Sequence, residues 1–126
     1  MNIILWILQI FLGLYFVVIG VMHFAVPPGL PPQMAWMYEL RPWLHWVSGI
    51  AEILGGIGLI LPGLMRIKPQ LTVWAALGLV AVMIGAMIWH LTRGEAQNMG
   101  LNIILAALLT FIAYGRYKLQ PIPEKA

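Results

Sequence analysis

The sequence of 126 residues has no cysteine, no aspartate and little charge of either sign. The lack of cysteine excludes a disulfide framework, a thiolate metal site and a thiol relay carried by this chain. Charged residues make up 9% of the chain, whereas a soluble domain carries about 25%. Seven Lys and Arg with four acidic residues cannot coat a globule of 14.1 kDa. A soluble monomer, a disordered segment and a nucleic-acid-binding protein are therefore excluded.

The sequence is instead rich in long apolar runs, and 62% of its residues are hydrophobic. About 20 apolar helical residues cross a bilayer core of about 30 Å. Four segments reach this length, at about 2–26, 43–61, 71–91 and 99–117. Because only closed hydrogen-bond ladders survive in lipid, we predict an all-α bundle of four transmembrane helices, one membrane domain over 1–126. The first segment lacks a basic leader, so we expect a retained span and not a cleaved signal peptide.

Basic residues in the loops give the orientation. Five basic residues fall on the side that holds both ends of the chain, namely Arg66, Lys68, Arg116, Lys118 and Lys125. The opposite loops hold only Arg41 and Arg93. By the positive-inside bias, both termini are predicted to be cytoplasmic, in a multi-pass protein of the plasma or inner membrane.

The outer loop at 27–42 is rich in proline and aromatic residues. Residues 27–32 contain four prolines and cannot be helical, while residues 34–40 resume an apolar pattern. This pattern predicts a short interfacial helix that lies in the headgroup layer or folds back onto the bundle. An ordinary aromatic-rich connector is the open alternative.

One face of each predicted span collects its small and polar residues, as helix interfaces in lipid require. In the order of the four spans, these faces hold Gln9, Gly13, Phe16, Gly20 and His23; then His45, Gly49, Glu52 and Gly56; then Thr72, Ala76, Met83 and His90; and finally Asn98, Asn102, Leu109 and Arg116. We expect them to form the interior. Alternating span directions then bring His23, Glu52, His90 and Asn102 to the outer half. The inner half is expected to be almost purely apolar, with Arg116 as an orientation anchor.

Glu52 is the main candidate functional residue. An ionised carboxylate within a span costs about 2.5–3.5 kcal/mol, so it marks either a proton-exchanging or ligand-binding group or a His-paired carboxyl that locks helices together. His23 and His90 could take its proton or bind a ligand head group.

Two further residues near the outer surface have simpler interpretations as well. Arg41 could reach a carboxylate or a lipid phosphate, or could be an interfacial cation. His45 is expected to be an interface residue. A metal site built from His23, Glu52 and His90 has no local ligand pair to support it, so no metal is predicted.

Three ordered motifs resemble those of the DoxX-like membrane proteins, over about 13–116. They are Gly20-Val21-Met22-His23-Phe24 before prolines; Gly49-Ile50-Ala51-Glu52 continuing to Pro62 with a basic loop behind it; and Ala86-x-x-x-His90-x-x-Arg93-Gly94-Glu95, followed by Asn102 and Tyr114-Gly115-Arg116. The resemblance implies a four-helix membrane bundle with His23, Glu52, His90 and Asn102 at the family's polar positions. The family is associated with quinone-linked sulfur oxidation, and relatives with redox stress or with chaperoning of membrane proteins. Some members use cysteines, and this chain has none.

The leading hypothesis is a quinone- or lipid-binding subunit of a membrane redox system, not an enzyme on its own. Its outer-leaflet pocket would contain Glu52, His23, His90, Asn102 and Arg41, and a partner subunit would supply electrons. One alternative is an assembly or scaffold factor for another membrane protein, and a weaker one is a small proton-coupled transporter. Small-residue faces also allow a homo-oligomer.

Overall fold

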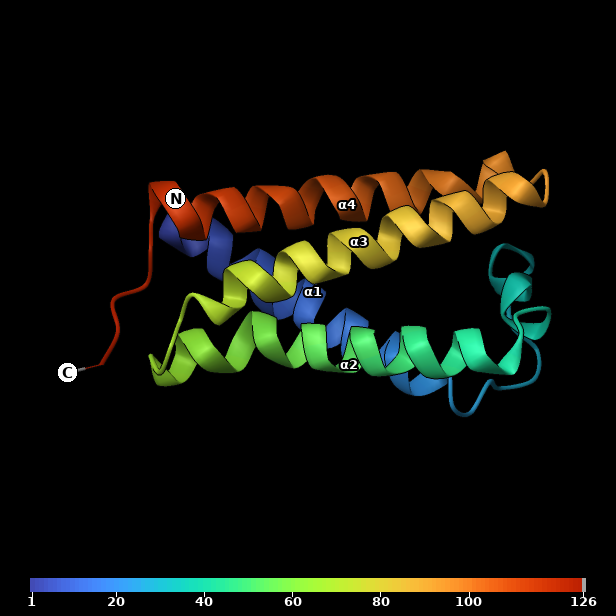
Figure 1. The fold of residues 1–126 in the computed structure, drawn as a ribbon, viewed down its shortest axis with the longest axis horizontal. Helices are drawn as coiled ribbons and strands as arrows, with labels where there is room; N and C mark the ends of the chain where they lie inside the picture. The colour runs from blue at the N-terminus through green and yellow to red at the C-terminus, as the bar shows by residue number, and fades with distance from the viewer. Residues whose placement is uncertain (126) are drawn as a thin grey trace.

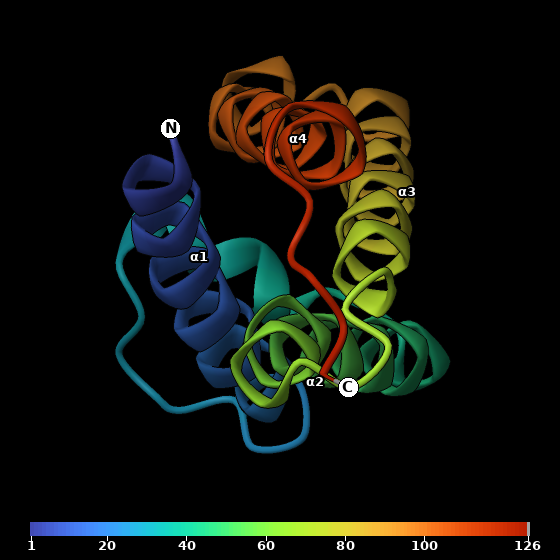
Figure 2. The same ribbon diagram turned by 90° about the vertical axis from the view of Figure 1, so that its left-hand side faces the viewer.

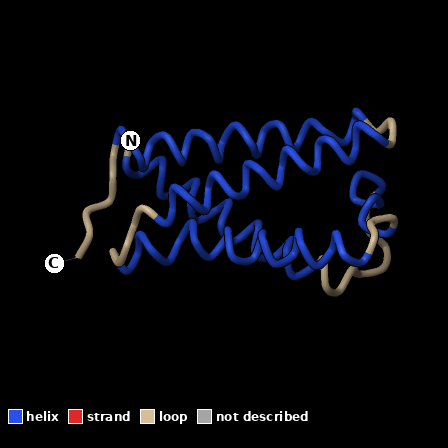
Figure 3. Tube along the Cα trace, viewed as in Figure 1, coloured by secondary structure: helices blue, strands red, loops and turns tan. Residues whose placement is uncertain are grey.

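The computed structural model describes residues 1–125, and all their regular structure is helical (Figures 1 and 3). The predicted all-α fold is confirmed. Four long helices are joined by loops and short helical turns. In chain order these are α1 (Asn2–Met22), the 3-10 helix η1 (Pro32–Tyr38), α2 (Pro42–Met65), α3 (Leu71–Thr92), the 3-10 turn η2 (Ala96–Asn98), α4 (Met99–Tyr114) and the π-helical turn η3 (Gly115–Leu119).

Four helical runs are long and apolar enough to cross a membrane: α1, α2, α3, and the run Ala96–Leu119 that contains α4. This matches the predicted number of spans. Their outward faces expose large apolar side chains such as Ile3, Leu54 and Ile88, which suits contact with acyl chains. The cytoplasmic placement of the termini stays a prediction.

The helices pack in sequence order, α1 on α2, α2 on α3 and α3 on α4, while α1 and α4 touch little. Both termini and the α2–α3 loop lie at one end of the bundle, which we call the terminal end (Figure 1). The opposite, loop end holds η1 and η2. Helix α1 starts beside the end of α4 and diverges from it towards the loop end (Figures 1 and 2).

Glycines set the distance between α1 and α2. A Cβ on Gly56 would lie 2.5 Å from the carbonyl oxygen of Gly13, and a Cβ on Gly20 would lie 2.9 Å from that of Gly49. The clashing atoms are backbone, so they cannot move aside cheaply. The glycine faces predicted to point inward are therefore where the two helices meet, as expected for small residues in lipid.

Helix α2 continues past Pro62, and the predicted end at residue 61 is wrong. Proline has no N–H, so the carbonyl of Gly58 loses its helical donor. The hydroxyl of Thr72 on α3 donates to that carbonyl at 3.1 Å. The amide of Gln9 on α1 donates to the next carbonyl, that of Leu59, at 2.7 Å. Donors from neighbouring helices thus allow the helix to continue.

Helix α1 ends at Met22, four residues earlier than the predicted boundary at 26. The backbone N–H groups of Phe24 and Ala25 make three-residue turns onto Val21 and Met22. Pro27 disfavours helical geometry at Val26, so the helix could not continue into the prolines.

The segment 27–41, which we call the cap, folds back onto the loop end of the bundle (Figure 1). The predicted short helix after the first span is present as η1. The Tyr38 hydroxyl donates to the Pro27 carbonyl at 2.6 Å and accepts from the N–H of Leu30 at 3.1 Å, which closes the loop. Met37 is 1% exposed, so η1 is anchored in the bundle.

The half of the bundle nearer the termini contains buried polar side chains, so the prediction of an almost purely apolar inner half is wrong. Gln9, Thr72 and Arg116 are all buried there. Arg116 is enclosed by the bundle at 4% exposure, so it is not an exposed orientation anchor.

Candidate functional site

Glu52 lies in the middle of α2 and is 5% exposed. Gly49 and Gly56, about one turn before and after it, let α1 approach closely enough for His23 to reach the carboxyl group. His23 Nε2 lies 3.0 Å from Glu52 Oε2. The contact is an ion pair when the imidazole is protonated, and Oε2 has no hydrogen-bond partner among residues 1–125. The structure therefore holds a buried carboxyl oxygen with unused hydrogen-bonding capacity beside an imidazole.

A second histidine fixes the tautomer of His23. His45 Nε2 lies 3.0 Å from the carbonyl oxygen of Met37, which can only accept, so this nitrogen donates. In neutral His45 the other nitrogen, Nδ1, must then accept, and it lies 2.9 Å from Nδ1 of His23. His23 therefore carries its proton on Nδ1 and presents Nε2 to Glu52. One further proton between His23 and Glu52 gives either a neutral acid with a neutral imidazole or a carboxylate with an imidazolium.

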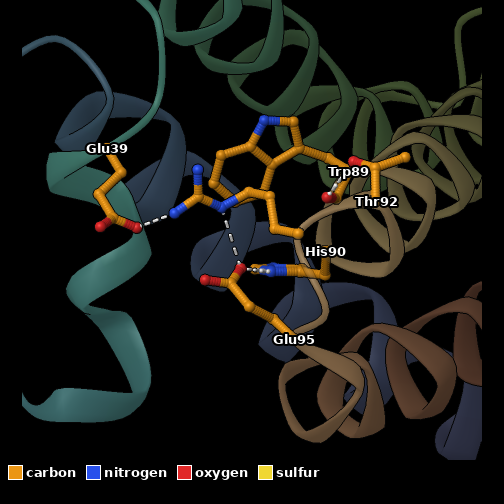
Figure 4. A network of polar contacts seen from close by, with 6 residues as sticks. Glu39, Trp89, His90, Thr92 and Glu95 are labelled. Carbon is orange, nitrogen blue, oxygen red and sulfur yellow. Dashed lines mark hydrogen bonds and ion pairs between the residues drawn. The ribbon is translucent and has the colours of Figure 1, made fainter.

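His90 enters the site from α3 and is held by a polar network at the loop end (Figure 4). Its Nδ1 lies 3.0 Å from Glu95 Oε1, and because a carboxylate only accepts, Nδ1 donates. Arg93 donates to Glu95 at 3.3 Å and also pairs with Glu39 of the cap. The hydrogen bond from His90, together with Arg93, lowers the pKa of Glu95 below its ordinary value. The network ties the cap to the end of α3.

Aromatic rings pack around His90. Trp36 of the cap meets the His90 ring edge-to-face, with ring centres 5.5 Å apart. The guanidinium of Arg93 lies 4.6 Å from the ring centre of Trp89. These contacts fix the imidazole against the inner face of the cap.

Two cavities meet at Glu52. The larger, of about 400 Å³, lies among α1, α3 and α4 beneath the cap. The smaller, of about 370 Å³, lies between α2 and α3. Glu52, His90, Trp36 and Ala86 line both cavities. Volumes in this range are typical of sites for small organic ligands.

The structure brings four of the five predicted site residues together. Glu52 and His90 line both cavities, His23 lines the smaller one, and Asn102 lines the larger one. Arg41 lies apart from them: its side chain is exposed at the start of α2, and it lines neither cavity. No group of three or more His or Glu residues within the described part of the chain is placed to hold a metal ion.

Sequence reasoning missed the roles of His45 and Trp36. His45 lies seven residues, or two turns, before Glu52 on the same helical face, so its inward position was visible in the pattern. Its contact with His23 was not, because that contact depends on where α1 ends. Trp36 contacts the site only because the cap folds back, which the pattern left open.

Comparison with known proteins identifies the family. The model of the DoxX-like family matches residues 7–112, from the second turn of α1 nearly to the end of α4. No curated protein and no solved structure matches the chain. The chain belongs to the DoxX-like family, and with its four apolar helices it is a multi-pass membrane protein.

Proposed function

We propose that this DoxX-like protein binds the polar head of a membrane-dissolved quinone in the cavities around Glu52. The observation that carries the proposal is a 95% buried carboxyl group that lines both cavities and has an oxygen without a hydrogen-bond partner among residues 1–125. A buried polar atom of this kind costs free energy unless a ligand supplies its partner. A ligand with carbonyl or hydroxyl groups would complete it.

Charge favours a quinone over a phospholipid head group at this site. A phosphate would meet the Glu52 carboxyl, and Arg41, the cation expected to pair with it, is exposed outside both cavities. A quinone head is neutral, accepts hydrogen bonds at its carbonyl oxygens and fits apolar walls such as Met83 and Leu105. The residues present therefore suit the quinone implied by the family.

The chain's own residues would hold protons at the site. When bound, a quinone supplies two-electron redox chemistry that is coupled to proton transfer. Nε2 of His23 lies 3.0 Å from the Glu52 carboxyl, and the contact of His45 with Nδ1 of His23 keeps Nε2 turned towards it. His90 donates from Nδ1 to Glu95, so Nε2 of the neutral ring is an acceptor, which suits a hydroxyl of the reduced, hydroquinone form of the ligand. Electrons would come from a partner redox subunit, in line with a chain without cysteine.

Entry from the membrane is the natural route to the larger cavity. Helices α1 and α4 both line it, and these two helices touch little. A ligand dissolved among acyl chains could therefore insert its head between them, while its tail stays in lipid.

Quinone binding tests the proposal directly. The purified protein in detergent is titrated with a short-tailed benzoquinone, and quenching of tryptophan fluorescence is followed. Glu52→Leu, which can neither donate nor accept, should weaken binding by about tenfold or more, the equivalent of one good hydrogen bond. Glu124→Gln removes a carboxyl group at the terminal end and should leave the affinity unchanged. Trp36→Phe should reduce the quenching amplitude, because Trp36 lines both cavities.

Equal affinity of wild type and Glu52→Leu contradicts the proposal. Displacement of the quinone by phosphatidylcholine at equal concentration would assign the site to a lipid instead. An unchanged quinone affinity, combined with loss of a co-purifying membrane protein in Glu52→Leu, would favour the assembly-factor alternative.

A further inference from the structure

Arg116 forms a second buried polar cluster, at the terminal end and far along the bundle from Glu52. It lies on η3, the π-helical turn that follows α4, and its side chain is enclosed by α1. Its Nε donates to Gln9 Oε1 at 2.5 Å. Its Nη1 donates to Asn2 Oδ1 at 2.7 Å and to the carbonyl of Gln120 at 2.9 Å. The Trp6 ring lies 5.3 Å from its central carbon.

The charge of Arg116 is not balanced by the chain. All its hydrogen-bond partners are neutral amide or carbonyl oxygens, and no carboxylate among residues 1–125 lies within ion-pair distance. Its Nη2 is enclosed and has no hydrogen-bond partner in the same part of the chain. A guanidinium stays protonated in a protein, and an unpaired buried ion costs several kcal/mol. The cluster therefore lacks an anion.

A cavity of about 310 Å³ adjoins this arginine. Arg116, Gln70, Trp74 and Tyr117 line it, together with Glu124. Trp74 and Tyr117 are each 67% exposed, as are aromatic residues that lie at the level of lipid headgroups. The site thus combines a buried cation with exposed aromatic rings at the end of the membrane-spanning helices.

The surroundings also favour an anion that comes from the membrane. The same end of the chain carries four more basic residues: Arg66, Lys68, Lys118 and Lys125. Glu124 is the one acidic residue there within 1–125. Exposed Leu71 and Ile67 lie next to these residues in the sequence and give acyl chains an apolar surface.

We propose that Arg116 binds the phosphate of an anionic phospholipid headgroup at the terminal end of the bundle. Gln9, Asn2 and Gln120 occupy the donors on Nε and Nη1, which leaves the two hydrogens of Nη2 for phosphate oxygens. Because Nη2 is enclosed, the headgroup has to enter through the adjoining cavity and displace side chains there to reach it. Trp74 and Tyr117 flank the glycerol region. This site is separate from the Glu52 cavities, and neither proposal depends on the other.

Native mass spectrometry of the detergent-purified protein tests this site with phosphatidylglycerol as the probe. Wild type should retain one lipid per chain, and Arg116→Gln should lower its affinity by about tenfold or more. Arg66→Gln removes the same charge from an exposed position at the same end and should change the affinity less than about threefold. Arg116→Lys keeps the charge but loses the planar fork, so it should restore binding only in part.

Three probes separate the sources of the anion. Diacylglycerol lacks the phosphate and should not compete, whereas phosphatidylcholine, with a compensating cation, should compete weakly. Inorganic phosphate should not displace the lipid. Equal losses in Arg66→Gln and Arg116→Gln, or competition by diacylglycerol, would overturn the proposal. Displacement by inorganic phosphate would overturn its assignment to a lipid.

A second variant keeps the test decisive where Arg116→Gln fails to fold. Asn2→Asp places a carboxylate at the atom that already accepts from Nη1 and so supplies the missing negative charge from within. This near-isosteric change should keep the fold, raise the melting temperature in lipid-free detergent and lower phosphatidylglycerol affinity by about fivefold. Undiminished lipid affinity in Asn2→Asp would show that Arg116 does not recognise the phosphate.

Discussion

The two ends of the bundle both bury ionisable side chains, but they balance charge in different ways. In the half of the bundle towards the loop end, the Glu52 carboxyl lies 3.0 Å from the His23 imidazole, the partner within the chain that can balance its charge. At the terminal end, Arg116 is surrounded by neutral oxygens and cannot lose its proton. The charge of Glu52 can therefore be balanced within the chain, which suits a neutral ligand. In our proposal, the charge of Arg116 is balanced by an anion from outside the chain.

The comparison teaches that burial alone does not define a functional site in this protein. At the terminal end, the donors on Nε and Nη1 of Arg116 are satisfied and one nitrogen remains. Around Glu52, by contrast, His23 contacts both His45 and the carboxyl group, and two cavities lie beside that carboxyl. Four changes test this difference, taken from the largest expected effect to the smallest.

Gly56→Leu should disrupt both ends together. Its Cβ would meet the backbone of α1 at Gly13, between the positions where α1 carries Gln9 and His23. Overpacking of this kind costs about 2–3 kcal/mol, so the melting temperature in detergent should fall sharply. Gly78→Leu is the matched control, because nothing lies within 4 Å of its Cβ position. Similar melting temperatures for the two variants would contradict the packing described here.

His23→Leu should destabilise the protein by about 2 kcal/mol, because it leaves the buried Glu52 without its proton-sharing neighbour. The double variant His23→Leu/Glu52→Leu should recover most of that loss, since apolar residues replace a buried pair well. The double variant should nevertheless fail to bind quinone. Thermal unfolding of the single and double variants measures the coupling, and additive losses would mean that the two residues do not interact.

His45→Phe should weaken quinone binding by about fivefold, roughly the value of one neutral hydrogen bond, and should shift the pH profile of binding. Without His45 the proton on His23 is free to move between its two nitrogens. His45→Gln is the conservative control, because its amide can still donate to the Met37 carbonyl and accept from His23. If His45→Phe and His45→Gln give the same pH profile as wild type, His45 does not position His23.

Glu95→Gln should have the smallest effect, and only above a defined pH. The pKa of Glu95 is lowered in the folded protein, chiefly by its hydrogen bond with His90, so its contribution to stability is present above the ordinary value of 4.5. That contribution is lost as the pH falls through the lower, folded-state pKa. The difference in melting temperature between wild type and Glu95→Gln should therefore be small at neutral pH and vanish in strong acid. A difference that grows on acidification would contradict the direction of the shift.

Much of the fold could be predicted from the sequence, because lipid leaves few alternatives. Apolar runs gave the number of spans, and helical periodicity gave their inner faces, including the positions of Glu52 and His23. The boundaries were less predictable, since α2 passes Pro62, where Thr72 supplies the donor that Gly58 loses and Gln9 bonds the next carbonyl. Those donors come from other helices and leave no signal near the proline itself.

The candidate site could be predicted in part for the same reason. Residues that lie on an inner face, such as His90 and Asn102, were visible in the pattern, and the cavities that they line were not. The position of Arg116 near a helix end predicts an orientation anchor, because interfacial cations are typical there. Its burial results from the approach of α1 at Asn2 and Gln9, more than 100 residues away in the sequence.

The larger cavity is lined by both α1 and α4, two helices that diverge towards the loop end and touch little (Figure 1). Acyl chains or detergent tails that fill the space between these helices form part of its wall. The affinity of any occupant then depends on the thickness and lateral pressure of the surrounding bilayer, in addition to the side chains that contact it. Measurements in micelles and in bilayers of different chain length should accordingly give different dissociation constants for the same ligand and protein. The host membrane is then a component of the binding site.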